Sequence, residues 1–358
     1  MGLTVSNTHT LDLYNVKISA LVRERYASHM KAMQLVQPGG AFHLVETPRP
    51  KPRDGEVLVK VRVCGVCRTD LHVVDGDLTD GAYPIVPGHQ IVGEVVQANG
   101  VDLTPGSRVG IPWLGYTCGH CAFCTAGTEN LCEAAEFTGY HRPGGFAEYT
   151  KADARFCFPL PETYDDLQVA PLLCAGLIGF RALEMTGEAV RIGFYGFGNA
   201  AHILTQIAVW QGKAVHAFTR DGDIVSQDFA RGLGAIWAGG ASDAPPQALD
   251  AAIIFAPVGA LVPAALKQIR KGGVVVCAGI HMSDIPSFPY ADLWGERTIR
   301  SVANLTRQDG RRLLELAPLA GVRTEISVYD LPDTAKALDD LRDGRIEGGA
   351  VIRVAGYA

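Results

Sequence analysis

The sequence of 358 residues lacks any apolar run close to the ~20 residues that a membrane-spanning helix requires. It also lacks a basic excess, because 32 Lys and Arg face 38 Asp and Glu and give a formal net charge of −6. Without a broad basic field, we expect neither nucleic acid nor an anionic membrane as a partner. The N-terminal segment lacks the apolar middle of a secretion signal. These absences predict a globular cytoplasmic protein.

Cysteine and glycine, by contrast, are well represented. Nine cysteines in a chain without a signal segment indicate a reducing compartment, where clustered thiols usually bind metal. The 41 glycines fit many tight turns between strands and helices. The chain is too long for one ordinary core, so we expect two domains.

The pattern of the chain changes near residue 165. Before it, short strand-like runs such as 57–63 are separated by glycine and proline, which favours a small β-barrel-like domain. After it, buried strands such as 191–195 alternate with helices such as 200–210. This alternation is typical of a parallel, doubly wound sheet. A continuous helix is predicted over 169–183, directly before that sheet.

Four cysteines form a tight cluster with the spacing C-x2-C-x2-C-x7-C. They are Cys118, Cys121, Cys124 and Cys132. Four thiolates favour tetrahedral Zn²⁺ and leave no open position, so the spacing predicts a structural zinc site. A disulfide knot and an iron–sulfur site are the alternatives for the same residues. The cluster is specific for a metal and says nothing about catalysis.

A second set of motifs is spread along the chain. The segment 64–72 reads Cys-Gly-Val-Cys-Arg-Thr-Asp-Leu-His, and a Gly88–His89 pair and the segment 173–176, Leu-Cys-Ala-Gly, follow. With these motifs, the chain from about residue 33 to its end resembles the zinc-dependent alcohol dehydrogenases of the medium-chain dehydrogenase/reductase superfamily. The resemblance implies an α/β protein with a GroES-like β-barrel catalytic domain and a Rossmann nucleotide domain.

The resemblance also implies domain boundaries. We expect a discontinuous catalytic domain at 30–170 and 305–358 and a nucleotide domain at 171–304, after an N-terminal extension at 1–29. A short strand at 350–354 should return to the first domain. The space between the domains should hold both the metal and the coenzyme. Family members are dimers or tetramers, and similarity to the bacterial forms favours a tetramer over a dimer.

In this family, the catalytic zinc ligands correspond to Cys67, His89 and Cys174. Two thiolates and one imidazole leave the fourth position of the metal open for water or substrate. Zinc lowers the pKa of bound water from about 16 to about 7, and an alcohol that behaves alike becomes an alkoxide, which loses hydride easily.

The resemblance assigns the proton path to residues that follow Cys67. Thr69 is expected at the alcohol hydroxyl, and His72 at the outer end of a relay through the coenzyme ribose. Asp70 is expected to orient His89. Two residues depart from the pattern, because Gln90 stands where the family usually has glutamate and Ile178 where many relatives carry threonine. A neutral amide cannot balance the metal charge, so we expect a more electrophilic zinc.

A glycine-rich loop follows the strand 191–195 and opens a helix, as in the dinucleotide-binding motif G-x-G-x-x-G/A. Its residues are Gly196, Phe197, Gly198, Asn199, Ala200 and Ala201. The helix N-terminus offers free N–H groups to the pyrophosphate. The resemblance adds Arg68 near the pyrophosphate, in a chain that has Gly349 where relatives often carry arginine. It also adds residues near the nicotinamide: Cys174, Ile178, Gly279 and Ile280.

The end of the second strand of this fold bears on the choice of coenzyme. NAD enzymes usually carry an acid there, about 20 residues after the glycine motif. Here Thr219 occupies the position and Arg220 follows. A hydroxyl and a guanidinium suit a 2′-phosphate, which favours NADP. Asp221 and Asp223 in the following loop could still reach a ribose, so NAD is the alternative.

The resemblance lines the substrate pocket with Thr69, Leu78 and Trp113, and the bulk of Trp113 favours small or slim substrates. The expected reaction is hydride transfer between a primary or secondary alcohol and NAD(P), which gives an aldehyde or ketone. An NADPH-dependent aldehyde reductase using the same site is one alternative. A non-catalytic zinc- or nucleotide-binding relative is the other.

Overall fold

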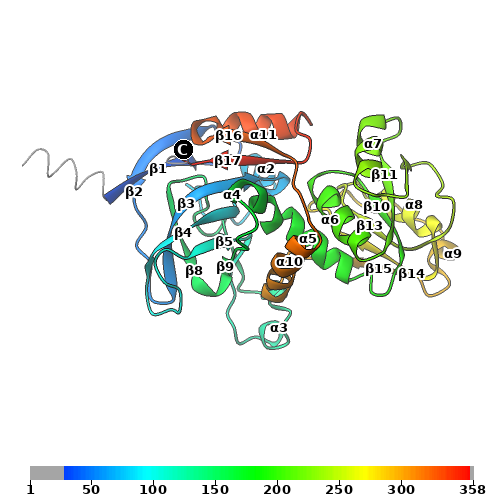
Figure 1. Ribbon diagram of the computed structural model, residues 1–358, viewed down its shortest axis with the longest axis horizontal. Helices are drawn as coiled ribbons and strands as arrows, with labels where there is room; N and C mark the ends of the chain where they lie inside the picture. Colours follow the sequence, from blue (N-terminus) through cyan, green and yellow to red (C-terminus); the bar gives the residue numbers. More distant parts are fainter. Residues whose placement is uncertain (1–27, 355–358) are drawn as a thin grey trace, which may run out of the picture.

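The computed structural model describes residues 28–354, so nearly all of the predicted extension at 1–29 lies outside the described residues. The described chain folds into two lobes that lie side by side (Figure 1). One lobe contains a seven-stranded sheet and the other a six-stranded sheet. The predicted combination of a barrel-like part and a doubly wound part is therefore confirmed.

The seven-stranded sheet is mixed, with one parallel pair among antiparallel neighbours. In spatial order its strands are β16 (Ile326–Asp330), β17 (Gly349–Arg353), β3 (Glu56–Val66), β4 (Gln90–Ala98), β5 (Arg108–Ile111) and β9 (Phe158–Pro159), with β8 (Tyr149–Asp153) beside β3. The C-terminal strand β17 pairs with β3, so the end of the chain returns to the first lobe as predicted (Figure 1).

The six-stranded sheet is parallel throughout. In spatial order its strands are β12 (Trp237–Gly240), β11 (Ala214–Thr219), β10 (Arg191–Tyr195), β13 (Leu249–Ile254), β14 (Ile269–Cys277) and β15 (Thr298–Ser301). In chain order this is 3-2-1-4-5-6, the Rossmann order, in which ligands bind where the order reverses. The reversal lies between β10 and β13, at the end of the strand that leads into the glycine-rich loop.

Burial on both faces explains the unbroken apolar run of β10. Successive residues of a strand point to opposite faces, so Phe194 packs in one core cluster and Tyr195 in another. Tyr195 stacks on Phe218 of β11 with ring centroids 4.1 Å apart. The helices that cover this sheet are α6 (Asn199–Trp210), α7 (Ile224–Gly232) and α8 (Leu261–Gln268).

The continuous helix predicted over 169–183 is wrong. The chain forms α4 (Asp166–Val169), a 3-10 turn (Ala170–Leu173) and α5 (Ala175–Glu184). The break is at Cys174, whose φ of −137° and ψ of −70° lie outside the helical region. An apolar run that is buried all round hides such a break, because periodicity does not change across it. The break makes Cys174 the N-cap of α5.

Residues 323–325, just before β16, are hydrogen-bonded to both lobes. Gln206 bonds them from α6, which covers the six-stranded sheet, and Gln168 from α4, which packs on the seven-stranded sheet. Gln206 of α6 donates to the carbonyl of Arg323 (2.8 Å) and accepts from its N–H (2.9 Å). Gln168 of α4 makes the same pair of bonds with Thr324, each 2.9 Å long. Next to them, the N–H of Glu325 donates to His202 Nε2 of α6 (3.3 Å).

The segment that carries the four-cysteine cluster extends from the first lobe. Its Glu129 is buried and accepts from Arg307 Nε at 3.0 Å. Its Asn130 donates to the carbonyl of Ala303 at 2.7 Å. Burial alone would raise the pKa of Glu129, but the Arg307 N–H groups and charge lower it. The elements not yet given are β1 (His29–Leu35), β2 (Phe42–Pro48), α2 (Arg68–Asp75), β6 (Leu114–Tyr116), α3 (Ala122–Thr125), β7 (Glu136–Phe137), α9 (Tyr290–Leu293), α10 (Arg307–Leu319) and α11 (Thr334–Arg342).

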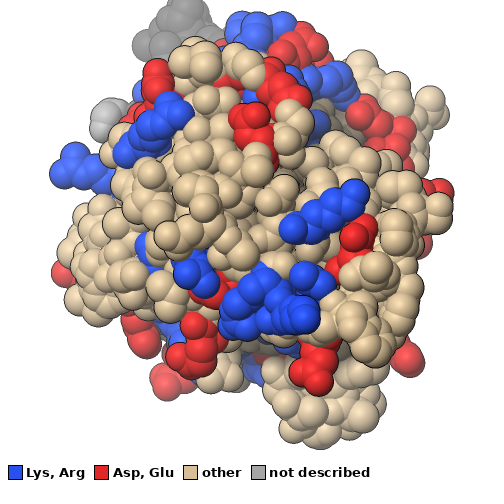
Figure 2. Space-filling view, turned by 90° about the vertical axis from the view of Figure 1, so that its right-hand side faces the viewer, with Lys and Arg blue, Asp and Glu red and all other residues tan. Residues whose placement is uncertain are grey.

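The surface carries charges of both signs. On the outer side of the six-stranded lobe, Lys and Arg are interspersed with Asp and Glu, and broad areas carry neither (Figure 2). Within residues 28–354, no single helix is long and apolar enough to cross a membrane, although the bent pair Asp166–Leu173 and Ala175–Glu184 meets the criteria of length and composition when taken together.

Candidate active site and metal centres

Three side chains that could bind a metal converge from distant parts of the chain. Cys67 precedes α2, His89 precedes β4 and Cys174 precedes α5. The Cys67 sulfur lies 3.1 Å from His89 Nε2 and 3.8 Å from the Cys174 sulfur, which is itself 3.3 Å from Nε2. Tetrahedral zinc with Zn–S of about 2.3 Å and Zn–N of about 2.0 Å sets ligand atoms about 3.5–3.8 Å apart. The S···S distance lies in this range and the two S···N distances are a few tenths of an ångström shorter, so two thiols and one imidazole suit zinc after a small outward shift and would leave its fourth position for water or substrate.

Asp70 fixes two of these three residues. Its Oδ2 accepts from the Cys67 N–H (2.9 Å), and its Oδ1 lies 3.0 Å from His89 Nδ1. The same turn is capped by the Cys67 sulfur, which accepts from the Thr69 N–H (3.3 Å). Because Nδ1 of His89 is engaged by a carboxylate, Nε2 is the nitrogen that faces the two thiols. The local fold of α2 thus orients the site.

The charges of the site suit a divalent cation. Burial raises the pKa of a thiol, but the hydrogen bonds from Cys174 and His89 and the charge of His89 hold the pKa of Cys67 well below its ordinary value. Burial lowers the pKa of His89, but nearby Asp70 and Cys67 raise it well above the usual value. The buried Cys67 thiolate favours a cation, whereas burial raises the pKa of Asp70 and the hydrogen bond with Cys67 raises that of Cys174.

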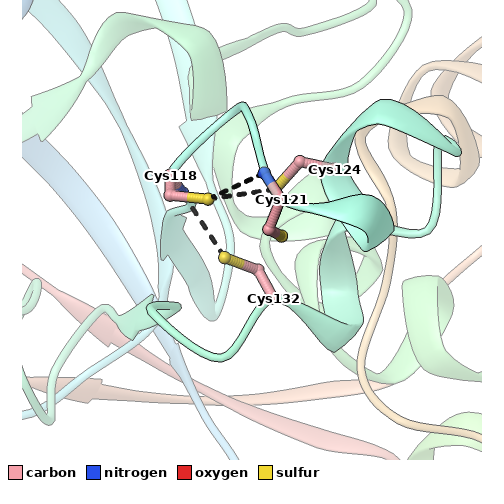
Figure 3. A group of neighbouring side chains, drawn as sticks. All are labelled: Cys118, Cys121, Cys124 and Cys132. Atoms are coloured by element: carbon pink, nitrogen blue, oxygen red, sulfur yellow. Dashed lines mark hydrogen bonds between the residues drawn. The ribbon is translucent and has the colours of Figure 1, made fainter.

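The four clustered cysteines form a second metal-type site, with side chains that point to a common centre (Figure 3). Their ligand atoms lie within 4.8 Å of one another, and the sulfurs of Cys118 and Cys124 are 3.9 Å apart. Backbone N–H groups of His120 and Cys121 lower the pKa of Cys118 to about 6. All four cysteines are free thiols, and a sulfur separation near 3.9 Å is far from the ~2.05 Å of a disulfide. The geometry thus favours a metal over the disulfide alternative.

The glycine-rich loop has the shape that a bound pyrophosphate needs. Gly196 has φ +91°, and a Cβ there would lie 2.9 Å from the backbone nitrogen of Ala256, so only glycine fits. Gly198 is the N-cap of α6 and makes no side-chain cap bond. The first N–H groups of α6 are therefore available to an anion. Ala201 is fully buried, which lets α6 pack close to the sheet.

The expected nicotinamide segment lies beside this loop. A Cβ on Gly279, which follows β14, would lie 3.2 Å from the carbonyl oxygen of Ala256, the residue that also contacts Gly196. Ile178 lies one helical turn after Cys174, and its N–H donates to the Cys174 carbonyl (2.9 Å). The structure therefore brings the glycine loop close to the Gly279–Ile280 turn, and Ile178 close to the metal-type site. Arg68 is exposed at the start of α2.

Comparison with known proteins agrees with this geometry. Residues 53–162 match the protein family described as "Alcohol dehydrogenase GroES-like domain". The chain is 44% identical over 339 residues to the "Probable alcohol dehydrogenase AdhA" of Mycobacterium tuberculosis, and the match covers 91% of this chain and 97% of the relative. The chain belongs to the zinc-dependent alcohol dehydrogenases of the medium-chain dehydrogenase/reductase superfamily. It is an oxidoreductase that interconverts alcohols and carbonyl compounds with a nicotinamide coenzyme.

Solved structures agree with the fold of this alcohol dehydrogenase. The acetophenone reductase of Geotrichum candidum, in complex with NAD, is 26% identical with a TM-score of 0.82, and the match covers 91% of this chain and 97% of that one. A protein described as a zinc-binding dehydrogenase of Sinorhizobium meliloti 1021, bound to NADP, is 25% identical with a TM-score of 0.81, over 91% and 99% of the two chains.

At the end of β11, the second strand of the nucleotide-binding sheet, one of the two residues expected at a 2′-phosphate is buried. Thr219 is buried, and its hydroxyl lies 2.9 Å from the Arg220 carbonyl and 3.3 Å from the Gly239 carbonyl. The amide of Gln227 donates to the same hydroxyl at 3.1 Å. Thr219 is thus engaged inside the lobe, whereas Arg220 is exposed. Of the two residues expected at a 2′-phosphate, Arg220 alone faces solvent.

Gln90 follows His89 directly and is fully buried. Its two amide atoms are buried without a hydrogen-bond partner in the described structure. A Cβ on Gly65 would lie 2.6 Å from Oε1, so the amide packs against the glycine of β3. A buried amide without partners is costly, but a buried carboxylate without partners is costlier still. Gln90 therefore brings no charge into the buried surroundings of its neighbour His89.

An aromatic cluster lies beside the metal-type site. Trp113 contacts His89 edge to face with ring centroids 5.0 Å apart, and stacks on Phe137 at 5.0 Å. Leu78 belongs to the same cluster, together with Tyr140. The sequence motifs did not point to Phe137 of β7 or to Tyr140, which follows it, because neither residue belongs to a motif. The wall next to the metal-type site is therefore aromatic.

Proposed function

We propose that Cys67, His89 and Cys174 hold the catalytic zinc of this alcohol dehydrogenase. The observation that carries the proposal is the convergence of their ligand atoms within 4.8 Å. Zinc with three protein ligands supplies a Lewis acid, which lowers the pKa of an alcohol and polarises a carbonyl. Asp70 keeps His89 in the orientation that presents Nε2.

We propose that Thr69 and His72 carry the proton of the substrate hydroxyl out of the buried site. They are three residues apart on α2 and therefore lie on one face of the helix. Thr69 is only 8% exposed, and its hydroxyl can accept one proton while it donates another. A proton can thus leave the buried site without a charged group next to the substrate. His72 has a buried Nε2 without a partner among the described residues, which suits an acceptor.

We assign a second, structural zinc to Cys118, Cys121, Cys124 and Cys132, whose closed set of thiols leaves no place for a substrate. Two clusters of free thiols support the reducing, cytoplasmic compartment expected from the sequence. We also retain the domain boundaries expected above, with the two lobes at 30–170 plus 305–358 and at 171–304.

For the coenzyme, we propose that the loop Gly196–Ala201 holds the pyrophosphate and that the turn Gly279–Ile280 and Ile178 contact the nicotinamide. The uncapped N-terminus of α6 supports the first assignment, and the shared contact with Ala256 supports the second. We propose NADP as the preferred coenzyme, because the exposed Arg220 offers a cation to a 2′-phosphate. That preference also favours the second candidate function, an NADPH-dependent aldehyde reductase using the same site.

We propose that Thr69, Leu78 and Trp113 line the substrate pocket.

We also propose that the working form is a homo-oligomer, namely a tetramer. The open edge of β15 supports the oligomer, because a strand edge can pair with that of a second copy. Nearby Tyr290 and Trp294 are 68% and 64% exposed. Sedimentation of the wild type and of Trp294→Glu tests this, and a wild-type monomer would refute it.

The main test combines a panel of alcohols and aldehydes, NAD(H) and NADP(H), and a metal assay on the purified protein. We expect two zinc ions per chain, coenzyme-dependent turnover and a preference for NADP(H). Cys174→Ser should retain one zinc and the fold but lose turnover. Cys277→Ser changes a free thiol outside both clusters and should retain both zinc ions, the fold and turnover. Full activity of Cys174→Ser without the second metal would contradict the proposal.

A further inference from the structure

His72 and Asp77 form a close pair at the outer end of α2. The chain turns at Gly76, the αL cap of the helix, and the N–H of Asp77 donates to the His72 carbonyl at 3.0 Å. This turn brings Asp77 Oδ2 to 2.7 Å from His72 Nδ1. The hydrogen bond from His72 lowers the pKa of the Asp77 carboxyl, so the carboxylate accepts the Nδ1 proton. A neutral imidazole that carries its proton on Nδ1 has a bare Nε2.

The other ring nitrogen of His72, Nε2, has no such partner in the described part of the chain. Nε2 is buried and has no hydrogen-bond partner among residues 28–354. A buried acceptor without a donor loses free energy, so this atom indicates a donor that the described residues do not provide. A molecule bound between α2 and the nicotinamide turn can provide it.

His281 contacts the same imidazole from the other lobe. It follows the Gly279–Ile280 turn, and its ring centroid lies 4.7 Å from that of His72. Its φ of +50° is uncommon for a residue with a side chain, so its contacts must hold it there. His281 is exposed on its other side. One carboxylate and two imidazoles thus meet where the lobes touch.

Of the other charges on α2, Arg68 is exposed one helical turn before His72, and the acids are engaged elsewhere. Asp70 faces inward and binds His89. Asp75 binds Arg342 Nη2 of α11 at 2.5 Å. Among the described residues, the ionisable groups that touch His72 are therefore Asp77, on its own side, and His281, across from it.

We propose that Asp77 and His281 are positioning residues that act through His72: Asp77 fixes the tautomer in which Nε2 accepts a proton, and His281 limits the charge that the pair of imidazoles can carry. The proposal rests on the role proposed above for His72. In each turnover Nε2 takes up one proton while Asp77 retains the Nδ1 proton, and Nε2 then gives its proton to water when the bound molecule leaves, so the imidazole returns to its neutral Nδ1–H tautomer. The contact with His281 links that step to the approach of the nicotinamide turn to α2.

The first test uses the pH profile of kcat for alcohol oxidation. Asp77→Asn removes a negative charge beside His72, so the imidazole loses its proton more readily and the rising limb moves to lower pH, by about half a unit to one unit. His281→Gln removes a group that competes for the same positive charge, so the limb moves to higher pH. Asp75→Asn, an acid on the same helix paired to Arg342, is the matched control and should not shift the limb. Shifts in the same direction, or a lower plateau without shifts, would overturn the proposal.

The second test needs no activity. Protein labelled with ¹⁵N-histidine and free of coenzyme is examined by long-range ¹H–¹⁵N correlation, and the His72 signal is assigned by its loss in His72→Gln. We expect the Nδ1–H tautomer in the wild type and in Asp75→Asn, and a shift toward the Nε2–H tautomer in Asp77→Ala. If His72 of the wild-type protein carries its proton on Nε2, the proposal is wrong even if the enzyme is active. The expected tautomers in a protein that oxidises no alcohol would instead refute the proposed function alone.

Discussion

Gly349, the first residue of β17, lies directly against the side chain of Asn199, the first residue of α6. A Cβ on Gly349 would lie 3.1 Å from Asn199 Nδ2. The contact joins the C-terminal strand of one lobe to the glycine-rich loop of the other. Asn199 Oδ1 is buried without a hydrogen-bond partner in the described structure. The chain thus has a glycine beside the expected pyrophosphate, where its relatives often place a cation.

Gly349→Arg should therefore strengthen coenzyme binding. A guanidinium near two phosphates contributes about 1 kcal/mol when partly exposed, so we expect the KM for the coenzyme to fall about fivefold. The Asn199 side chain has to move by a few tenths of an ångström to admit the new Cβ. Gly349→Gln is the uncharged control of similar length and should not lower KM. Equal effects of the two variants would show that charge is not the cause.

The two residues at the end of β11 should behave differently when they are changed. Arg220→Ala should raise the KM for NADPH about tenfold or more and leave that for NADH nearly unchanged, because only a 2′-phosphate needs the cation. Thr219→Val should leave the coenzyme preference intact. It should lower the free energy of unfolding by about 1–2 kcal/mol, because Gln227 loses the acceptor of its buried amide. A switch of coenzyme preference in Thr219→Val would contradict this division of roles.

Loss of the four-cysteine metal should weaken the fold without abolishing the chemistry at the other site. Structural zinc contributes about 10–16 kcal/mol to the folding of small zinc-finger peptides. Cys132→Ser should bind one zinc fewer per chain and lower Tm by several degrees or more. Cys277→Ser provides the comparison, since that thiol is half-buried and lies outside both clusters. Full zinc content in Cys132→Ser, measured by atomic absorption, would argue against the assignment.

Acid should destabilise the protein through His202. Burial lowers the pKa of this histidine from its ordinary value of 6.5 to about 4. The unfolded chain then binds one proton more than the folded protein between about pH 6.5 and pH 4, so stability is lost as pH falls through this window. The loss reaches about 2 kcal/mol at pH 5 and about 3 kcal/mol at pH 4.

His202→Gln should remove this dependence. The difference in unfolding free energy between wild type and variant, from urea titrations at pH 7.5 and pH 5, should change by about 2 kcal/mol in favour of the variant at the lower pH. The exposed His43 supplies a control, because its replacement by glutamine leaves the buried site untouched. A difference that is constant with pH would exclude the effect.

The sequence predicts the centre of the six-stranded sheet better than its edge. The strand expected at 191–195 is found at the same residues, because an apolar run marks a strand buried on both faces. β15 at the edge of this sheet and β16 at the edge of the seven-stranded sheet escape prediction, since their residues are mostly exposed or half-buried and form no such run. The break at Cys174 escapes it too, because the surrounding residues are apolar on every side.

The catalytic ligands could not be derived from spacing. Cys67 and Cys174 are 107 residues apart, and no local pattern connects them. Resemblance to a family supplied the set, and the fold then brings the atoms together. The four-cysteine cluster is the opposite case, because its short spacing is itself the signal. Contacts such as His72 with His281 depend on how the lobes meet, which no segment of the sequence encodes alone.

The segment before β16 is held by its main chain, since Gln206 binds both the N–H and the carbonyl of Arg323 and Gln168 binds those of Thr324. At position 323 only the main chain is bound, whereas the buried Thr324 hydroxyl also donates to Gln168. Evolutionary drift should thus be wide at position 323 among amino acids with a free amide and should stop at proline, which has no hydrogen to donate, and position 324 should keep a hydroxyl as well.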